Sequence, residues 1–333
     1  MTGAGSEGRA SSTCSAHSAH GAHGERGADN GILLQLRGVS KRFGGLRAVD
    51  AFDLDVREGS ITSLIGPNGA GKTTVFNLIT GIYRPDEGRI TFAGRELVGK
   101  LPHQVAEAGI ARTFQTLRLF ENLTCFENVL AGQHCRGRAG VAASIFRTAG
   151  QRREEERMRS EAERCLRQMG LWGCRDELAR NLPYGNRRRL EIARALATGP
   201  RLLILDEPAG GLNEEETAGL IDLIEEIRGS GITVFLIEHD MQVVMGVSDL
   251  VAVMDNGQKI SEGTPEEVQQ DPRVVEAYLG TEDDTDEMDE ADKMGESNES
   301  SMSETEQIGK TGNTGCGGDG DVGRVRTDWH EPA

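Results

Sequence analysis

Between residues 31 and 280, short apolar runs alternate with segments of helical periodicity. Five runs consist mainly of aliphatic and β-branched residues, and some have no polar position: residues 32–36, 61–65, 202–205, 232–237 and 251–254. A strand that is apolar on both faces is typical of a parallel sheet covered by helices on both sides. The pattern therefore predicts an α/β core built on a largely parallel sheet.

Amphipathic stripes mark the helices between these runs. Residues 216–228 carry one apolar stripe at helical spacing, formed by Leu220, Leu223, Ile224 and Ile227. Residues 151–169 carry a similar stripe against a background of Arg and Glu. Because the stretch from about 116 to 200 has little strand character, we expect a helical subdomain inserted in the α/β domain.

Residues 1–30 and 281–333 lack the apolar positions that a folded segment buries. The first segment is mainly Gly, Ala, Ser and His without periodicity, and the second contains 16 acidic and four basic residues. Such compositions are typical of unfolded segments. We therefore predict a disordered leader (1–30), an ordered body (31–280) and an acidic disordered tail (281–333).

The net charge of −17 is concentrated in the tail, whereas the body carries 35 acidic and 31 basic residues. A nearly neutral body gives no electrostatic reason to expect nucleic-acid binding. The chain has no run of roughly 18–20 apolar residues, which a membrane-spanning helix requires. The first thirty residues also lack the basic start and apolar centre of a secretory signal. We therefore expect the chain to work in the cytosol, with its cysteines reduced.

The clearest chemical motif is a run of nine residues, Gly66-Pro67-Asn68-Gly69-Ala70-Gly71-Lys72-Thr73-Thr74. It has the form G-x-x-x-x-G-K-T and lies between the predicted strand 61–65 and an apolar helical segment at 75–80. Glycines let successive backbone N–H groups turn into one concavity, and the following helix adds its own unpaired N–H groups and positive dipole. We therefore expect all nine residues to bind the phosphates of ATP. Lys72 should reach the β- and γ-phosphates, and the Thr73 hydroxyl should bind Mg²⁺.

Two carboxylates, Asp206 and Glu207, directly follow the predicted strand 202–205. The first can hold Mg²⁺, and the second can polarise a water in line with the γ-phosphate, because phosphoryl transfer depends on positioning and charge stabilisation. Taken alone, the pair could equally end a strand at a solvated turn. After a phosphate-binding loop, the catalytic interpretation is favoured.

Four further segments follow in a fixed order. They are residues 111–115 (ARTFQ), 182–190 (LPYGNRRRL), 211–213 (GLN) and 237–240 (IEHD). Together with the phosphate loop and Asp206-Glu207-Pro208, this order resembles the nucleotide-binding subunits of ABC transporters over about residues 32–280. The resemblance narrows to the ATPases of branched-chain amino acid importers (the LivG type), which have similar segments, a helical insert such as residues 134–160, and a similar ending at 277–280 (AYLG).

The resemblance implies an ABC ATPase architecture. That architecture is an α/β fold with a P-loop NTPase (RecA-like) core on a parallel sheet, an antiparallel β subdomain, and the inserted α-helical subdomain at about 116–200. It also implies that Phe43 stacks on adenine, for which the alternative is a core phenylalanine.

The resemblance assigns roles to the polar residues as well. Gln115 matches the glutamine that contacts Mg²⁺ and the attacking water and senses the membrane partner. Asp206 matches the Mg²⁺ carboxylate, and Glu207 matches the catalytic one. His239 matches the histidine that contacts the γ-phosphate. Thr73, Gln115 and Asp206 are thus the implied metal ligands.

The signature segment departs from the wider family pattern Leu-Ser-Gly-Gly-Gln. Here it reads Leu182-Pro183-Tyr184-Gly185-Asn186, so the Ser hydroxyl is missing and Pro183 has no N–H. Importers of this type usually have Ala in place of the Ser. Proline is tolerated at the first turn of a helix, and Tyr184, Gly185 and Asn186 are still expected to contact nucleotide.

The resemblance implies an ATPase without a channel of its own. Two ATPase subunits, identical or different, would enclose two ATP molecules, each phosphate loop facing the signature of the other subunit. Their closure would act on two transmembrane permease subunits, and a solute-binding protein would be an indirect partner. The chain would then lie on the cytoplasmic face of the cell membrane as a peripheral subunit.

Four alternatives differ from the branched-chain amino acid importer in substrate or class. A urea or amide importer and a lipopolysaccharide exporter have similar Tyr-Gly signatures, although the helical insert argues against the exporter. A soluble ABC ATPase of DNA repair or translation would carry two cassettes or a long coiled coil, and this chain has neither. A scaffold that binds nucleotide without hydrolysis is disfavoured because Lys72, Glu207 and His239 are all present.

Overall fold

The computed structural model describes residues 31–133 and 149–279. The predicted disorder of 1–30 and 281–333, and the first part of the insert at 134–160, fall outside the described residues. All described residues belong to the unit that ends at Leu279. In the described part of the chain, no helix combines the length and the apolar character that crossing a membrane requires.

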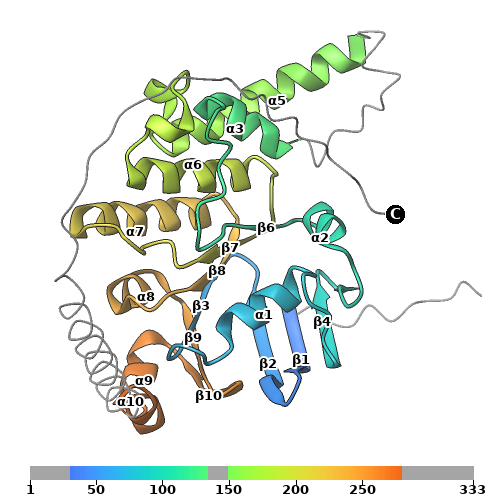
Figure 1. Ribbon diagram of the computed structural model, residues 1–333, viewed down its shortest axis with the longest axis vertical. Helices are drawn as coiled ribbons and strands as arrows, with labels where there is room; N and C mark the ends of the chain where they lie inside the picture. The colour runs from blue at the N-terminus through green and yellow to red at the C-terminus, as the bar shows by residue number, and fades with distance from the viewer. Residues whose placement is uncertain (1–30, 134–148, 280–333) are drawn as a thin grey trace, which may run out of the picture. The chain divides into compact units, whose positions relative to one another are not determined.

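The larger sheet has six strands in the order β10-β9-β3-β8-β7-β6 (Figure 1). Their bounds are β3 Ile61–Ile65, β6 Ile110–Arg112, β7 Leu202–Asp206, β8 Thr233–Ile237, β9 Leu250–Asp255 and β10 Gln258–Gly263. The β6–β7, β7–β8, β8–β3 and β3–β9 pairs are parallel, and only the edge pair β9–β10 is antiparallel. Every residue of β3, β7 and β8 is buried, which confirms the prediction of a largely parallel sheet from apolar runs.

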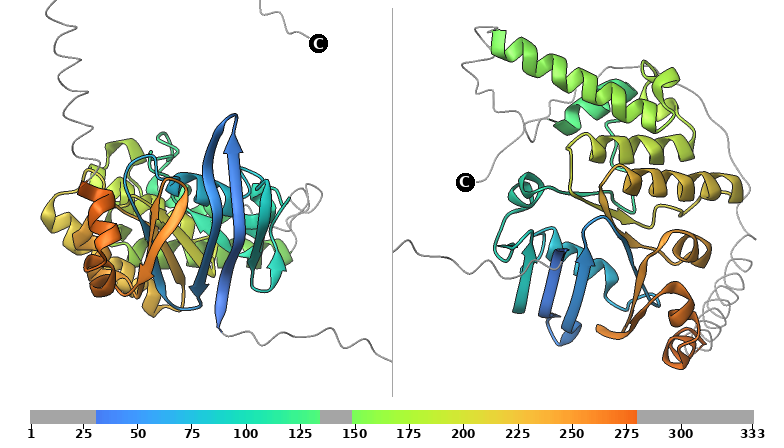
Figure 2. Two further views of the ribbon diagram at one scale, coloured as in Figure 1. Left: turned by 90° about the horizontal axis from the view of Figure 1, so that it is seen from below. Right: turned by 180° about the vertical axis from the view of Figure 1, so that it is seen from behind.

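The smaller sheet is antiparallel, in the order β2-β1-β4-β5. Its strands are β1 Ile32–Phe43, β2 Leu46–Arg57, β4 Glu87–Phe92 and β5 Arg95–Glu96. It supplies the antiparallel subdomain implied by the family resemblance. Strand β2 lies beside the β9–β10 hairpin (Figure 2), where the Asp50 amide donates to the Gly257 carbonyl over 2.8 Å.

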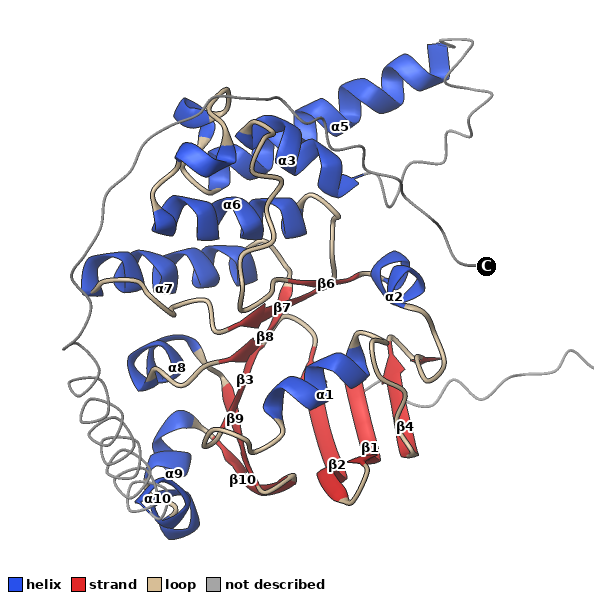
Figure 3. Cartoon of the chain, viewed as in Figure 1, coloured by secondary structure: helices blue, strands red, loops and turns tan. Residues whose placement is uncertain are grey.

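The two faces of the larger sheet are covered by different elements. Residues of alternating position in β7 show this: Leu203 and Leu205 pack in a core with α7 (Glu214–Gly229), whereas Leu202 and Ile204 pack with α1 (Lys72–Ile79) and the smaller sheet. The helices accordingly flank the strands on both sides (Figure 3). The remaining helices near the sheet are α2 Pro102–Ala108, α8 Met241–Val247, α9 Pro265–Gln269 and α10 Pro272–Leu279.

Helices α3, α5 and α6 pack on one another and form the predicted helical subdomain. Their bounds are α3 Cys125–Gly132, α5 Ala149–Gln168 and α6 Tyr184–Leu196, with short 3-10 turns η2 Trp172–Cys174 and η3 Ala179–Asn181 between them. The apolar stripe of α5 is buried at Ala162, Cys165 and Leu166. Among the described residues of 116–200, the β structure consists of one isolated bridge, Thr124–Leu178.

Candidate nucleotide-binding and catalytic site

The predicted site residues meet because of the order of the strands. The phosphate loop follows β3, Asp206 ends β7 and Glu207 follows it, His239 lies just beyond β8, and Gln115 lies just beyond β6. These four strands are parallel neighbours. Their carboxyl ends therefore lie at one edge of the sheet, where open α/β sheets bind ligands.

Two glycines of the phosphate loop are required by close backbone contacts. A Cβ atom on Gly66, whose φ is 146°, would lie 1.9 Å from the Met254 carbonyl oxygen, and one on Gly71, at φ 106°, would lie 2.3 Å from that of Ala48. Gly71 is also the N-cap of α1, which has no side-chain cap and no acidic residue in its first turn. The first N–H groups of α1 are thus unpaired by side chains and suited to an anion.

Lys72 is buried at the start of α1. Its Nζ donates to the carbonyl oxygens of Gly66 and Pro67, over 2.7 and 2.8 Å. Burial lowers the pKa of Lys72, whereas the carboxylates of Glu207 and Asp206 act to raise it. The Lys72 ammonium therefore interacts electrostatically with both carboxylates at this edge of the sheet. The next residue, Thr73, is exposed.

The two carboxylates have different partners. Asp206 is buried, and its Oδ2 accepts from Arg112 Nη2 over 2.7 Å. Arg112 also donates to Asn77 Oδ1 on α1 over 2.6 Å. Glu207 is only partly buried and has a φ of 46°, which is rare for a residue with a side chain. Its Oε2 accepts from Gln115 Nε2 over 2.7 Å.

The segment after β8 contains a buried carboxylate that sequence reasoning did not single out. Glu238 is fully buried and accepts from the amides of Ala209, His239 and Asp240, over 2.7, 3.0 and 3.3 Å. Burial raises its pKa, against the opposing effect of these amides. Glu238 therefore ties the turn after β7 to the segment of His239, whose own side chain is 62% exposed.

Phe43 is not a core residue, which was the alternative to its stacking on adenine. Phe43 ends β1, is 42% exposed, and meets Tyr83 edge-on with ring centroids 5.1 Å apart. The ammonium of Lys41 lies 5.6 Å from the Phe43 ring centroid. A partly exposed aromatic ring of this kind can offer a surface for stacking.

Tyr278, near the end of α10, also reaches the phosphate loop. Its side chain packs on the apolar cluster that contains Ile65 and Val253. Burial raises the pKa of the Tyr278 hydroxyl, and a hydrogen bond with the Gly66 backbone acts to lower it. The sequence held a signal for this residue, since the ending 277–280 was one of the segments shared with the importer ATPases.

The signature segment begins α6. Pro183 is the N-cap, with φ −53° and no side-chain hydrogen bond to the helix, so it precedes the first turn rather than lying in it as expected. Tyr184 is exposed, and its hydroxyl donates to the Gly210 carbonyl over 3.1 Å. Gly185 is buried against α7: a Cβ there would lie 2.5 Å from Glu216 Oε1. Within the described ranges, no hydrogen bond or ion pair joins Tyr184, Gly185 or Asn186 to the phosphate loop of the same chain.

The donor set fits a magnesium nucleotide. The start of α1 offers backbone N–H groups without a side-chain cap, and the absence of a Cβ at Gly66 and Gly71 lets the loop pack closely on the backbone of Met254 and Ala48. A hydroxyl (Thr73) and a carboxylate (Asp206) at the same edge are oxygen ligands of the kind that Mg²⁺ prefers. Glu207 and Gln115 add a carboxylate and an amide that can orient a water molecule.

Comparison with known proteins places the chain among transport ATPases. The family described as ABC transporter matches residues 49–210, and that described as Branched-chain amino acid ATP-binding cassette transporter matches 258–284. The high-affinity branched-chain amino acid transport ATP-binding protein LivG of Salmonella typhimurium is 47% identical over 249 residues, or 74% of this chain and 98% of LivG. BraF of Pseudomonas aeruginosa, which has the same description, is 45% identical over 249 residues, again 74% of this chain and 98% of the relative.

Solved structures agree with these relatives. The ADP conformation of an ATP-binding cassette of an ABC transporter has a TM-score of 0.66 and 36% identity, and covers 75% of this chain and 99% of its own. A nucleotide-free ATP-binding cassette from an ABC transporter has a TM-score of 0.66 and 34% identity, and covers 74% of this chain and 98% of its own.

Proposed function

The chain belongs to the ABC transporter family as an ATP-hydrolysing subunit, and on that premise we propose that it powers uptake of branched-chain amino acids through separate membrane subunits. The comparisons confirm the family and the ABC ATPase fold that the sequence predicted. The proposed substrate is supported by the descriptions of LivG and BraF and by the C-terminal family match over 258–284.

The observation that carries the catalytic proposal is the 2.7 Å hydrogen bond between Gln115 and Glu207 beside the phosphate loop. A carboxylate held by an amide at this edge can accept the proton of an attacking water. Lys72 and the amides of the loop would stabilise the charge of the transferred phosphoryl group. The exposed ring of His239 would contact the γ-phosphate, and Phe43 would stack on the base. Mg²⁺, held by Thr73, Asp206 and Gln115, would neutralise phosphate charge.

We propose that the signature segment, residues 182–186, contacts a second nucleotide, which is held by a partner ATPase subunit. With Pro183 as N-cap, the N–H groups of Tyr184, Gly185 and Asn186 have no side-chain acceptor. Helix α6 therefore begins with donors suited to a phosphate. The Pro183 ring removes the hydroxyl contact of the wider family at that partner site only, at a cost of roughly 0.5–1.5 kcal/mol for one hydrogen bond.

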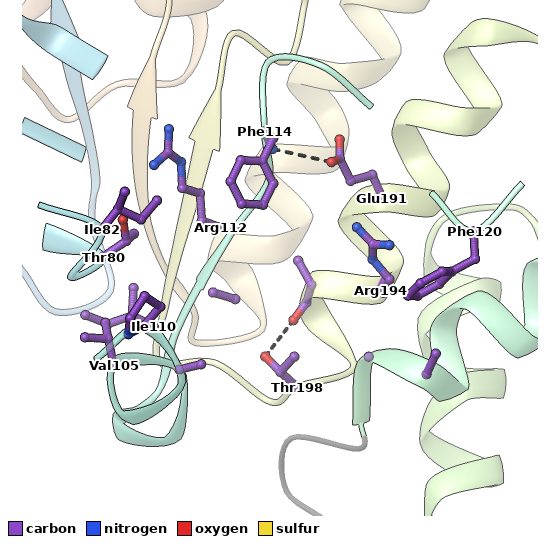
Figure 4. A pocket seen from close by; sticks show the side chains of 16 residues that line it. Thr80, Ile82, Val105, Ile110, Arg112, Phe114, Phe120, Glu191, Arg194 and Thr198 are labelled. Carbon is purple, nitrogen blue, oxygen red and sulfur yellow. Dashed lines mark hydrogen bonds between the residues drawn. The ribbon is translucent and has the colours of Figure 1, made fainter. Parts of the chain in front are cut away.

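A groove beside Gln115 supports the proposed permease partner. Its volume is about 360 Å³, and its wall runs from α2 through Phe114 and Phe120 to α6 (Figure 4). Phe120 is 53% exposed, and the Arg194 guanidinium lies 5.6 Å from its ring centroid. Exposed apolar side chains next to a cation suit an amphipathic helix with a carboxylate. A permease segment there would contact the loop that carries Gln115, at the cytoplasmic face of the membrane.

Reconstitution in proteoliposomes tests the proposal. The chain, a second ATPase subunit, two permease subunits and the solute-binding protein would be assembled, and uptake of labelled leucine and of labelled urea would be compared. We expect ATP-dependent leucine uptake that Glu207→Gln abolishes. Urea uptake without leucine uptake would replace the substrate assignment by the urea importer, and ATPase activity that no membrane partner stimulates would favour a soluble ATPase.

A surface variant separates the partner from the chemistry. Phe120→Ser should weaken association with the permease subunits and leave the ATPase activity of the isolated subunit unchanged. Val275→Ser is the matched control, because Val275 is an exposed apolar residue on α10, outside the groove. If both variants assemble normally, the groove is not the docking surface.

A further inference from the structure

Arg188 is a charged side chain that is buried completely. It lies one turn into α6 and is 1% exposed. Its guanidinium is paired with Glu191 Oε2, 3.0 Å away, on the same helix. A buried charge is destabilising unless it is paired and hydrogen-bonded, and the remaining donors of Arg188 have well-defined acceptors.

Those acceptors belong to the two segments that carry the proposed catalytic pair. Nη1 donates to the Phe114 carbonyl over 2.7 Å, next to Gln115. Nε donates to the Pro208 carbonyl over 3.3 Å. Nη2 donates to the carbonyls of Asp206, over 3.1 Å, and of Glu207. One guanidinium thus binds three consecutive carbonyls, from the last residue of β7 into the turn that follows, and also the backbone next to Gln115.

These contacts bear on the conformation of Glu207. Its φ of 46° is sparsely populated for a residue with a Cβ and persists only where the surroundings enforce it. The carbonyls before, at and after Glu207 all point at Arg188, so the guanidinium stabilises the turn in this conformation. The same guanidinium fixes the backbone that presents Gln115 to the Glu207 carboxylate.

We infer that Arg188 is a positioning residue that makes the geometry of the Gln115–Glu207 pair depend on the position of helix α6 in the same chain. The inference rests on the proposed catalytic role of Glu207. A shift of α6 would move a rigid fork bonded to both segments, and displacements of about 1 Å can lower turnover on the order of 10²-fold. The nucleotide-binding loop has no part in these bonds, so affinity for ATP should not change.

The variant that tests the inference is Arg188→Lys. A lysine keeps the charge opposite Glu191, but its single ammonium cannot reach Phe114 and the turn after β7 together. We expect ATP affinity and melting temperature close to those of the wild type, with turnover reduced on the order of 10²-fold. Hydrogen exchange at the amides of residues 205–212 should be faster than in the wild type.

Arg189→Lys is the matched control, since Arg189 is the next residue of the helix and its guanidinium faces α7, near Gly219. The control should leave turnover and exchange unchanged. If Arg188→Lys destabilises the fold, the paired change Arg188→Met with Glu191→Gln removes the buried charge and is measured in its place. If this pair also fails to fold, the role of Arg188 is structural and the inference is wrong.

A double-mutant cycle distinguishes positioning from a general loss of structure. Residual hydrolysis is measured for Glu207→Gln with and without Arg188→Lys, at high enzyme concentration. If Arg188 acts through Glu207, the second change should lower turnover less than threefold in that background. Equal fold-losses in both backgrounds would overturn the inference, as would a parallel loss of ATP binding. Failure of the proposed function would appear separately, as normal hydrolysis by Glu207→Gln alone.

Discussion

Replacing the carboxylate of Glu207 by an amide tests the proposed catalytic site most directly. Glu207→Gln keeps the size of the side chain, and the new amide can rotate to offer its oxygen to Gln115 Nε2, now 2.7 Å from Glu207 Oε2. The backbone of the turn keeps its bonds to Arg188. The change therefore removes a proton acceptor while leaving the surrounding structure in place.

The size of the effect follows from the role of a general base. Such a group contributes about 10²–10⁴-fold to the rate, or roughly 3–5 kcal/mol at about 1.36 kcal/mol for each factor of ten. ATP affinity should stay close to that of the wild type, because Lys72 keeps its bonds to the carbonyls of Gly66 and Pro67 and the backbone amides of the loop are unchanged. Lys72→Ala should instead weaken nucleotide binding itself.

Two measurements on both variants separate these roles. Binding of a fluorescent ATP analogue reports affinity, and phosphate release under saturating ATP reports turnover. Wild-type affinity with slow release is expected for Glu207→Gln, and weak affinity for Lys72→Ala. A Glu207→Gln protein that releases phosphate at the wild-type rate would refute the assignment of Glu207.

Three further predictions concern packing, the tail and the thiols. Gly185→Ala should cost about 0.5–1.5 kcal/mol, seen as a lower melting temperature. The new Cβ displaces Glu216, which also accepts from the Asn213 amide, so Glu216→Ala should reduce the loss, and an equal loss would contradict the clash. Removing residues 283–333 should leave the melting temperature and ATPase activity unchanged, whereas a clear fall in either would show that the acidic tail supports the body. Burial raises the pKa of the Cys125 thiol to about 11 and that of the Cys165 thiol to about 12, from 9.0. Both thiols should therefore resist alkylation at pH 8, and labelling of either thiol in the folded protein, detected by mass spectrometry, would disprove this resistance. The stability that the two buried thiols contribute should be lost as pH rises through these pKa values.

The sheet was predictable where burial is complete and less so at its margins. Strands β3, β7 and β8 are buried on both faces, so their sequences are mainly apolar and predicted these strands directly. In strand β2, buried and more exposed positions alternate: Phe52, Leu54 and Val56 are buried, and aspartates lie between them. Such alternation, with one face of the sheet in solvent, predicts a strand less clearly than an apolar run does. Strand β6 has three residues, and β10 is a mostly polar edge strand.

The candidate site was predictable where it consists of contiguous residues. The phosphate loop and Asp206-Glu207 are local motifs, but the partners of the carboxylates come from distant segments. Arg112 and Glu238 lie within segments 111–115 and 237–240, but the sequence of these segments does not show which partners the two side chains have. Arg188 is the middle of three arginines, and only its place on the buried stripe of α6, four residues before Ile192, could have distinguished it.

The geometry of the signature also limits which experiment can reveal a partner subunit. A charged side chain at Gly185 would repel a nucleotide held in trans, but an Asp at this position would first meet Glu216 of its own chain. Loss of activity in Gly185→Asp would therefore not separate a trans contact from local damage.

Pro183 is the better position for this test, because it caps α6 without any side-chain hydrogen bond that a substitution would break. A Ser at this position would add an N-cap acceptor, worth about 0.5–2 kcal/mol, and would lose roughly 0.4–1 kcal/mol of proline rigidity. Pro183→Ser should thus leave stability nearly unchanged. In a complex that pairs a Lys72→Ala chain with a partner subunit whose phosphate loop is intact, any rise in hydrolysis caused by Pro183→Ser must therefore come from the nucleotide of the partner.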